Sequence, residues 1–170
     1  MSDPRRTIYC VDTSALIDLA RQYPRNVFPG LWRELDALVD AGRLIAPVEV
    51  KKEIEQGEDL LSQWARRRRR MFVGLTPAQL AWLTRILEAF PAFAGEAKPP
   101  PYADPHVIAL VLSRRSEGRQ VLFPQAEHVV VTHERPNPKG KPRMPDVCRH
   151  YQIECIRLPE LFQRENWRFP

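Results

Sequence analysis

Long apolar stretches are absent from this chain of 170 residues. A helix that crosses a bilayer needs roughly 18 or more consecutive apolar residues, and no run in the sequence approaches that length. The N-terminal residues, Met-Ser-Asp-Pro-Arg-Arg, also lack the apolar segment of a secretory signal. The sequence therefore predicts a cytoplasmic protein with no membrane partner.

Cysteine is scarce as well, with three residues in the chain. They are Cys10, Cys148 and Cys155, and no two of them have the Cys-x-x-Cys spacing. An odd number, with members in two predicted strands, indicates buried thiols in a reducing compartment. A zinc site formed by Cys148, His150 and Cys155 is an alternative, but this spacing matches no standard zinc motif.

Acidic residues are fewer than basic ones, and the formal net charge is +5. Most of the excess lies in one run of consecutive arginines, namely Arg66, Arg67, Arg68, Arg69 and Arg70. Positive charge concentrated in this way favours contact with the phosphates of a nucleic acid. An acidic protein partner, or simple exposure on a helix face, would also account for the run.

Apolar residues make up 44% of the chain, and its length suits one domain, which we expect to span residues 1–170. Segments typical of buried strands alternate with segments of helical period. Strands are predicted at residues 7–11, 44–46, 128–132 and 152–156. Helices are predicted at residues 13–21, 31–40, 47–56, 59–69, 76–90, 104–118 and 145–151. This alternation predicts an α/β fold with a parallel sheet, and residues 58–102, without a strand signal, form a helical excursion.

Asp12 stands where the first predicted strand meets the first predicted helix. In open α/β sheets, ligands bind in the crevice outside the carboxyl ends of the strands. A carboxylate at this junction is therefore a candidate ligand for Mg²⁺ or Mn²⁺. Ser14 follows in the pattern Asp-x-Ser, and its hydroxyl could hydrogen-bond that carboxylate. Capping of the helix by Asp12 is the alternative interpretation.

Two further candidate acids lie on predicted helices. Glu53 follows Val50 in the pattern Val-x-x-Glu-Ile and shares a helix face with Glu49, four residues earlier. Asp104 precedes Pro105 at the start of an apolar helix, where capping and metal binding are compatible because a carboxylate has two oxygens. Surface ion pairs with neighbouring lysines are the alternative for the glutamates.

The fourth acidic position follows the third predicted strand. Glu134 comes two residues after Thr132, so that a hydroxyl and a carboxylate could meet the other acids. Asp146, between Pro145 and Val147, competes with Glu134 for this position. We favour Glu134. The alternative is that Glu134 is a loop residue without a functional role that faces its neighbour Arg135.

In this order the motifs resemble those of the PIN-domain ribonucleases, especially the VapC-like toxins of prokaryotic toxin–antitoxin pairs. The matching stretches are residues 9–17, 50–54, 104–110 and 129–134. The resemblance implies a three-layer α/β/α sandwich and an endonuclease that hydrolyses RNA phosphodiester bonds to 5′-phosphate and 3′-hydroxyl ends. We expect Asp12, Glu53 and Asp104 to hold Mg²⁺ or Mn²⁺, directly or through water, and Glu134 to complete the catalytic acids.

The resemblance also implies partners. These are an RNA substrate, a cognate antitoxin protein and a second copy of the chain in a homodimer. The arginine run would follow the RNA backbone and make binding dependent on salt. The chain departs from the family pattern in two ways: its fourth acid is Glu134 where Asp is usual, and its helical stretch at 58–102 is longer than in the smallest members.

Two rival functions deserve comparison with a ribonuclease. A phosphatase of the haloacid dehalogenase type also begins with Asp after a first strand, but it needs a second Asp two residues later, where this chain has Ser14. A catalytically degenerate module that binds RNA or protein is the stronger rival, because Glu134 replaces the usual Asp.

Overall fold

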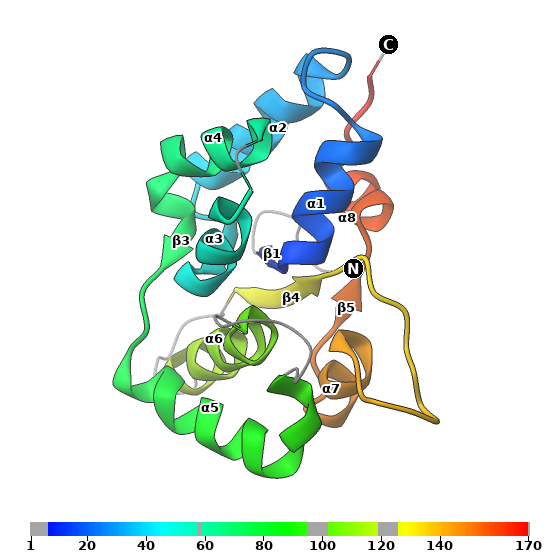
Figure 1. Cartoon of the computed structure of the whole chain (residues 1–170). Helices are drawn as coiled ribbons and strands as arrows, with labels where there is room; N and C mark the ends of the chain where they lie inside the picture. The colour runs from blue at the N-terminus through cyan, green and yellow to red at the C-terminus, as the bar shows by residue number, and fades with distance from the viewer. Residues whose placement is uncertain (1–6, 58, 95–101, 119–125, 170) are drawn as a thin grey trace.

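Five parallel strands form one sheet in the computed structural model, which describes residues 7–57, 59–94, 102–118 and 126–169 (Figure 1). Their order across the sheet is β3-β2-β1-β4-β5. Each neighbouring pair is parallel. The strands are β1 (Thr7–Val11), β2 (Leu44–Pro47), β3 (Phe72–Val73), β4 (Glu127–Val131) and β5 (Cys155–Ile156). The predicted parallel α/β fold is therefore confirmed.

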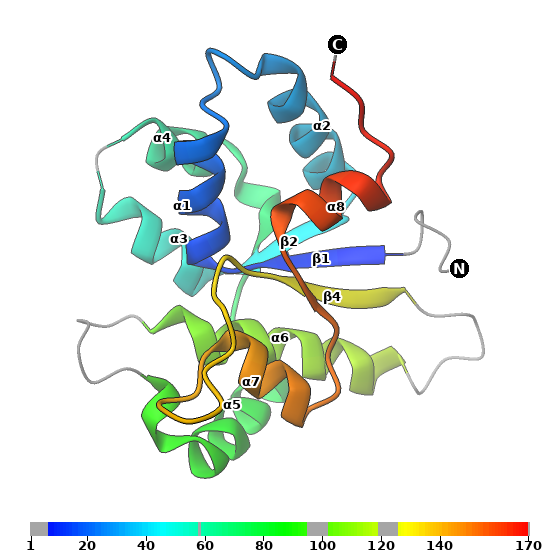
Figure 2. The same ribbon diagram turned by 90° about the vertical axis from the view of Figure 1, so that its right-hand side faces the viewer.

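Helices cover both faces of this sheet and give a three-layer sandwich. Figure 2 shows α1, α2, α4 and α8 on one side of the strands and α5, α6 and α7 on the other. The helices are α1 (Thr13–Gln22), α2 (Pro29–Asp40), α3 (Val48–Glu55), α4 (Leu60–Arg67), α5 (Pro77–Ala89), α6 (Ala103–Gly118), α7 (Met144–His150) and α8 (Leu158–Arg164), with short 3₁₀ turns η2 (Arg69–Met71) and η3 (Pro91–Ala94). Within the described ranges, no helix is long and apolar enough to cross a membrane.

The central strands are apolar on both faces because each face is covered by helices. In β1 the residues Tyr9, Cys10 and Val11 are buried, and they pair in register with Val129, Val130 and Val131 of β4. This pairing continues past the strand ends, since the Asp12 amide donates to the Val131 carbonyl at 3.1 Å. The ends of β1 and β4 are therefore held side by side.

Helix α6 packs between the sheet and α5. It contacts β1, β2 and β4 on one side and α5 on the other. Every residue from Val107 to Ser113 is buried, which agrees with the apolar sequence of the central turns of this helix. Its first turn, with Asp104, is thereby fixed at one edge of the sheet.

Two helix starts follow the chemistry that the sequence indicates. The Asp12 side chain accepts a hydrogen bond from the Ala15 amide and caps α1. The Thr76 hydroxyl accepts one from the Gln79 amide and caps α5. Both caps satisfy an amide that a helix start otherwise leaves without a partner.

The stretch between residues 58 and 102 contains a strand, so the prediction of a purely helical excursion is wrong there. Phe72 and Val73 pair with Ala46 and Pro47 and form the edge strand β3. A pair of residues carries too little periodicity to distinguish a strand from a loop. The predicted strand at 152–156 shortens to Cys155–Ile156, because Gln152 has a positive φ of 53° and forms a turn.

Candidate functional site

The strand order places a crevice between the ends of β1 and β4. From β1 the chain adds β2 and β3 on one side of the sheet, and then β4 and β5 on the other. In open α/β sheets, ligands bind outside the carboxyl ends of the strands at such a switch point. Asp12 directly follows β1, and Thr132 directly follows β4. The first and fourth predicted motifs therefore meet at the position where this architecture binds ligands.

Asp12 is fully buried, and its two oxygens have different surroundings. Oδ1 accepts hydrogen bonds from the Ala15 amide and the Ser14 hydroxyl, both at 2.8 Å. Oδ2 is buried and has no hydrogen-bond partner among the described residues. Burial raises the pKa of Asp12 to about 6, against the lowering effect of the Thr132 hydroxyl, the Ala15 amide and the Ser14 hydroxyl, and the charge of Glu134 adds to the rise. Capping thus occupies one oxygen of Asp12, while the other has no partner among the described residues.

Hydroxyl groups connect the end of β1 to the end of β4. Ser14 Oγ lies 3.2 Å from Thr132 Oγ1. The His133 amide donates to Ser14 Oγ at 3.0 Å, and the Glu134 amide donates to Thr132 Oγ1 at 3.1 Å. This network fixes the backbone after β4 against the first turn of α1, which orients Glu134.

A cleft of about 250 Å³ opens beside this network. Its walls come from α1, α3, α6 and the segment after β4. The lining residues are Thr13, Ser14, Ile17, Asp18, Arg21, Glu53, Asp104, His133 and Glu134. Three predicted acids, Glu53, Asp104 and Glu134, therefore share one cleft although they are distant in the sequence. Asp12 itself does not line the cleft and lies buried next to Thr13 and Ser14, which do.

The start of α6 joins two of these acids. Glu53 Oε1 accepts a hydrogen bond from the amide of Ala103, the first residue of α6, at 2.8 Å. Asp104 follows in the same first turn and is half-buried. The amides at a helix start favour negative charge, so this end of α6 stabilises both carboxylates at the cleft.

Glu134 and Asp146, which competed for the fourth acidic position, have different roles in the structure. Glu134 lines the cleft, and its Oε2 accepts a hydrogen bond from the Met144 amide at 2.8 Å. Asp146 accepts hydrogen bonds from the amides of Asn137 and Arg143 through a single oxygen, Oδ2. Asp146 therefore holds the start of α7 and the preceding loop together, and Glu134 is the one at the cleft.

Glu49, the helix-face neighbour of Glu53, is turned away from the cleft. It is buried, and its Oε2 lies 3.5 Å from His106 Nδ1. Burial lowers the pKa of His106, against the opposing effect of Glu49. The contact joins α3 to α6, so we assign Glu49 a structural role.

Three ionisable residues of the cleft were not predicted as site residues from the sequence: Asp18, Arg21 and His133. Asp18 lies one turn after Ser14 on α1, and this spacing could have placed it on the same face. His133 separates Thr132 from Glu134, and its Nδ1 lies 3.0 Å from Asp18 Oδ2. Arg157 also approaches that nitrogen at 3.2 Å. No local motif signals the His133 contacts, because they depend on how α1 and α8 pack.

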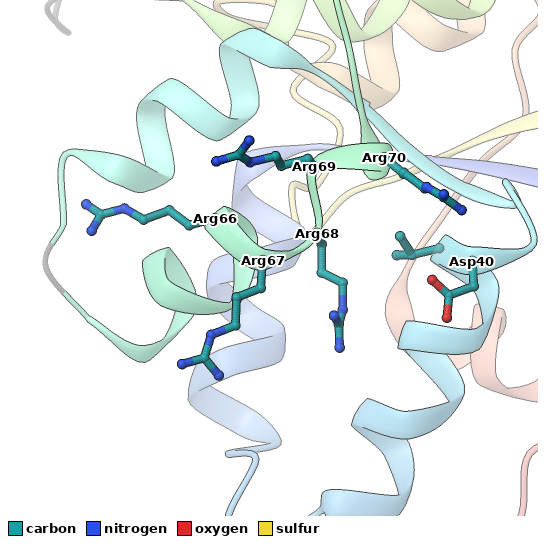
Figure 3. Close-up of a pocket in the computed structure, with 7 residues that line it drawn as sticks. Asp40, Arg66, Arg67, Arg68, Arg69 and Arg70 are labelled. Atoms are coloured by element: carbon teal, nitrogen blue, oxygen red, sulfur yellow. The ribbon is translucent and has the colours of Figure 1, made fainter.

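The arginine run lies apart from the acid cleft. Arg66 to Arg70 line a separate pocket of about 460 Å³ together with Val39 and Asp40 (Figure 3). Val39 and Asp40 precede β2, and Arg69 and Arg70 precede β3, so the pocket lies on the amino-terminal side of these strands. The cleft acids, in contrast, follow carboxyl ends. The two pockets share no lining residue.

Arg68 differs from its neighbours in the run. Its Nε donates to Asp36 Oδ1 at 2.6 Å, and Trp64 Nε1 donates to the same oxygen at 2.8 Å. Burial opposes ionisation of Asp36, but the bonds from Arg68 and Trp64 hold the pKa of that carboxyl below its usual range. Arg68 therefore fastens α4 to α2.

The acids at the cleft offer oxygen ligands of the kind that Mg²⁺ and Mn²⁺ prefer. Oδ2 of Asp12 is buried without a partner among the described residues, although buried polar atoms ordinarily have one. Among the described residues, no three His, Cys, Asp or Glu side chains are close enough, as they stand, to share an ion. A spaced set still suits Mg²⁺, which keeps several waters and binds through one or two carboxylates.

The fold and the cleft together define an α/β protein with an acid-lined crevice at the switch point of a parallel sheet. The chain belongs to the family described as "Domain of unknown function (DUF4411)", which it matches over residues 9–169. The match includes every acid of the cleft. No curated protein and no solved structure matches the chain.

Proposed function

We propose that this protein is a metal-dependent endoribonuclease of the PIN-domain type that acts through the acid cleft. The observation that carries the proposal is the convergence of Glu53, Asp104 and Glu134 on one cleft beside the buried carboxylate of Asp12. These acids come from four segments distant in the sequence. Carboxylates that converge in this way repel one another unless a cation or a proton compensates them.

In this proposal Asp12, Glu53 and Asp104 would hold Mg²⁺ or Mn²⁺ partly through water, because Mg²⁺ keeps several waters and binds directly through one or two carboxylates. When bound there, the ion would supply Lewis-acid chemistry: it would lower the pKa of a bound water and polarise the scissile phosphate. Asp12 offers Oδ2, while its Oδ1 remains fixed by Ser14 and Ala15. Because the pKa of Asp12 is about 6, the carboxylate is mostly ionised at neutral pH and can bind a cation.

The remaining side chains of the cleft position these acids and the substrate. Thr132 and Ser14 hold the backbone of Glu134, and Glu134 contributes negative charge beside Asp12. Arg21 and His133 are the cationic and imidazole side chains of the same cleft. In this proposal they donate hydrogen bonds to phosphate oxygens of an RNA strand.

The proposed biological role and partners come from the sequence resemblance to VapC-like toxins. A VapC-like ribonuclease is the toxin of a toxin–antitoxin pair, acts in the cytoplasm, and is restrained by a cognate antitoxin protein. Homodimerisation belongs to the same proposal. The physical reason for a partner is simple: an active ribonuclease degrades the RNA of its own cell unless another molecule covers its cleft.

A module that binds RNA without cleaving it is the second candidate. It is favoured by the spacing of the acids, since no three of them, among the described residues, can share an ion without movement. Glu134 also uses Oε2 for the Met144 amide. In this case the protein would bind RNA but leave it intact at any metal concentration.

RNA cleavage by the pure protein tests the proposal. Single-stranded RNA is incubated with Mn²⁺, with and without a chelator, and the products are separated by size. We expect cleavage that the chelator stops, with 5′-phosphate ends. Asp12→Asn should abolish it, because an amide keeps the cap but removes the anionic ligand. Glu34→Gln, which changes an exposed acid of α2 that lines neither pocket, is the control and should retain activity.

Intact RNA under all conditions, with normal folding of the wild type, would support the binding module. Cleavage by Asp12→Asn at the wild-type rate would remove Asp12 from the mechanism. Release of phosphate from a small ester, without RNA cleavage, would instead favour a phosphatase.

A further inference from the structure

The arginine pocket has features that a structural role alone does not explain. Arg66 and Arg67 lie in the last turn of α4, where cations complement the helix dipole. Arg69 and Arg70 lie beyond that helix, in η2, and are exposed. Within the described part of the chain, neither of them forms an ion pair, and Arg67 forms none either. These side chains therefore keep their charge available for an external anion.

Contacts between α2 and α4 fix the backbone beside the arginine pocket. Arg68 and Trp64 both bind Asp36 of α2, and Trp64 is buried against Trp32, with ring centroids 5.3 Å apart. This contact fixes the end of α4 relative to α2 and orders the backbone that carries the other arginines. Figure 3 shows the consequence: Arg66, Arg67 and Arg69 spread to one side of Arg68, and Arg70 extends on the side of Asp40.

The lining favours a nucleic acid backbone over a protein partner. Protein interfaces have an apolar core, rich in aromatic residues, but the pocket has Val39 as its apolar lining residue. Interfaces with nucleic acids are more polar and far more positive. Guanidinium groups also match phosphates through paired hydrogen bonds. A series of arginines with diverging directions suits a chain of phosphates better than a single anion.

We propose that this arginine pocket is an anchor for single-stranded RNA that is separate from the acid cleft, so that one RNA strand is held at two points. Naming RNA as the ligand rests on the proposed ribonuclease function. Strand β2, which has four residues and is about 13 Å long, separates the amino-terminal side of the sheet from its carboxyl edge. An RNA that occupies both sites needs four or more stacked nucleotides, at about 3.4 Å each.

Binding of a labelled 20-nucleotide RNA, followed by fluorescence anisotropy, tests this anchor without any cleavage. The full chain carrying Asp12→Asn serves as the parent. The test variant adds Arg67→Gln, Arg69→Gln and Arg70→Gln, and leaves Arg68 and its structural bond intact. The control variant adds three changes of equal charge outside both pockets, namely Arg33→Gln, Arg85→Gln and Arg149→Gln. Thermal melts monitored by circular dichroism verify that both variants fold.

The test variant should bind the RNA about tenfold or more weakly at about 100 mM salt. Its slope of log K against log salt should fall by about 2, since each lost phosphate contact removes about 0.7 on a single strand. The control variant should change both quantities far less. Asp40→Asn, which removes the negative charge of the pocket, should tighten binding. A DNA strand of the same sequence should respond like RNA.

Equal losses in the test and control variants would overturn the anchor, because general charge would then explain the binding. Unchanged RNA binding in the test variant would overturn it too and leave an acidic protein as the partner of the pocket. A second assay distinguishes failure of the anchor from failure of the ribonuclease proposal. It measures cleavage of a trinucleotide by proteins in which Asp12 is unchanged. That RNA is too short to bridge the two sites, so the three arginine changes should leave its cleavage unaltered.

Discussion

The buried side chain of Asp12 is both a proposed metal ligand and a source of instability in the folded protein. Its carboxylate loses hydration in the core and has Glu134 nearby, and its pKa is raised to about 6. A group whose pKa is higher in the folded state binds more protons there than in the unfolded chain. Burial of the Asp12 carboxylate therefore does not lower the unfolding free energy at a pH below 3.8, the ordinary pKa of the group. It lowers that free energy by its full amount at a pH above about 6.

Asp12→Asn should consequently stabilise the protein at neutral pH. The gain in unfolding free energy over the wild type should grow between pH of about 4 and 7, and reach up to about 3 kcal/mol. Urea unfolding at a series of pH values measures it. If the unfolding free energies of the two proteins differed by the same amount at every pH, the pKa of Asp12 would not be raised by folding, and the prediction would be wrong.

The Asp12 case also shows what one residue can reveal from sequence. The run before it predicts a buried strand, and the cap on α1 follows from the Asp-Thr-Ser pattern; both agree with the structure. Its raised pKa could not be predicted, because burial by the surrounding fold and the charge of Glu134, which follows another strand, are its causes.

At the scale of helices and loops, the contact between α2 and α4 is the frame for the arginine pocket. Asp36→Ala would leave the buried Trp64 N–H without a partner and release Arg68. We expect a loss of about 2 kcal/mol in unfolding free energy, as for a buried donor left unsatisfied. Asp40→Ala, one turn along the same helix and exposed, should change it by less than about 0.5 kcal/mol. Equal effects in urea unfolding would contradict the assigned role of Asp36.

The loop before α7 depends on Asp146. Asp146→Ala removes the acceptor for the Asn137 and Arg143 amides, at a local cost of about 1 kcal/mol. Hydrogen exchange of these amides should become about fivefold faster, while Asp146→Asn, which keeps an acceptor oxygen, should behave like the wild type. Unchanged exchange in the alanine variant would show that the loop is held by other contacts.

Helices and strands were predicted unevenly, for physical reasons. Long segments with a clear period, such as α5 with its Thr76 cap, agree closely with the structure. The edge strand β3 was missed because its two residues are fixed by pairing with β2 rather than by their own pattern. The arginine run was expected on a helix, but the chain leaves α4 after Arg67 because Arg68 turns to bind Asp36.

Across the whole molecule, the position of the acid cleft follows from the topology of the sheet. The order of the strands brings the ends of β1 and β4 together, and α3 and α6 add Glu53 and Asp104 at the same edge. The sequence order of the motifs predicted this meeting of acids. It could not predict which acids would lie outside the cleft, because Glu49 contacts His106 on α6 and Asp146 binds the Asn137 and Arg143 amides.

Binding of Mn²⁺, followed by the electron paramagnetic resonance signal of the free ion, tests the central claim most directly. The wild type should bind Mn²⁺ at the cleft, and Asp12→Asn, Glu53→Gln and Asp104→Asn should each weaken that binding about tenfold or more. Glu34→Gln should bind like the wild type. Binding that is equal in all five proteins, or absent from the folded wild type, would contradict the account.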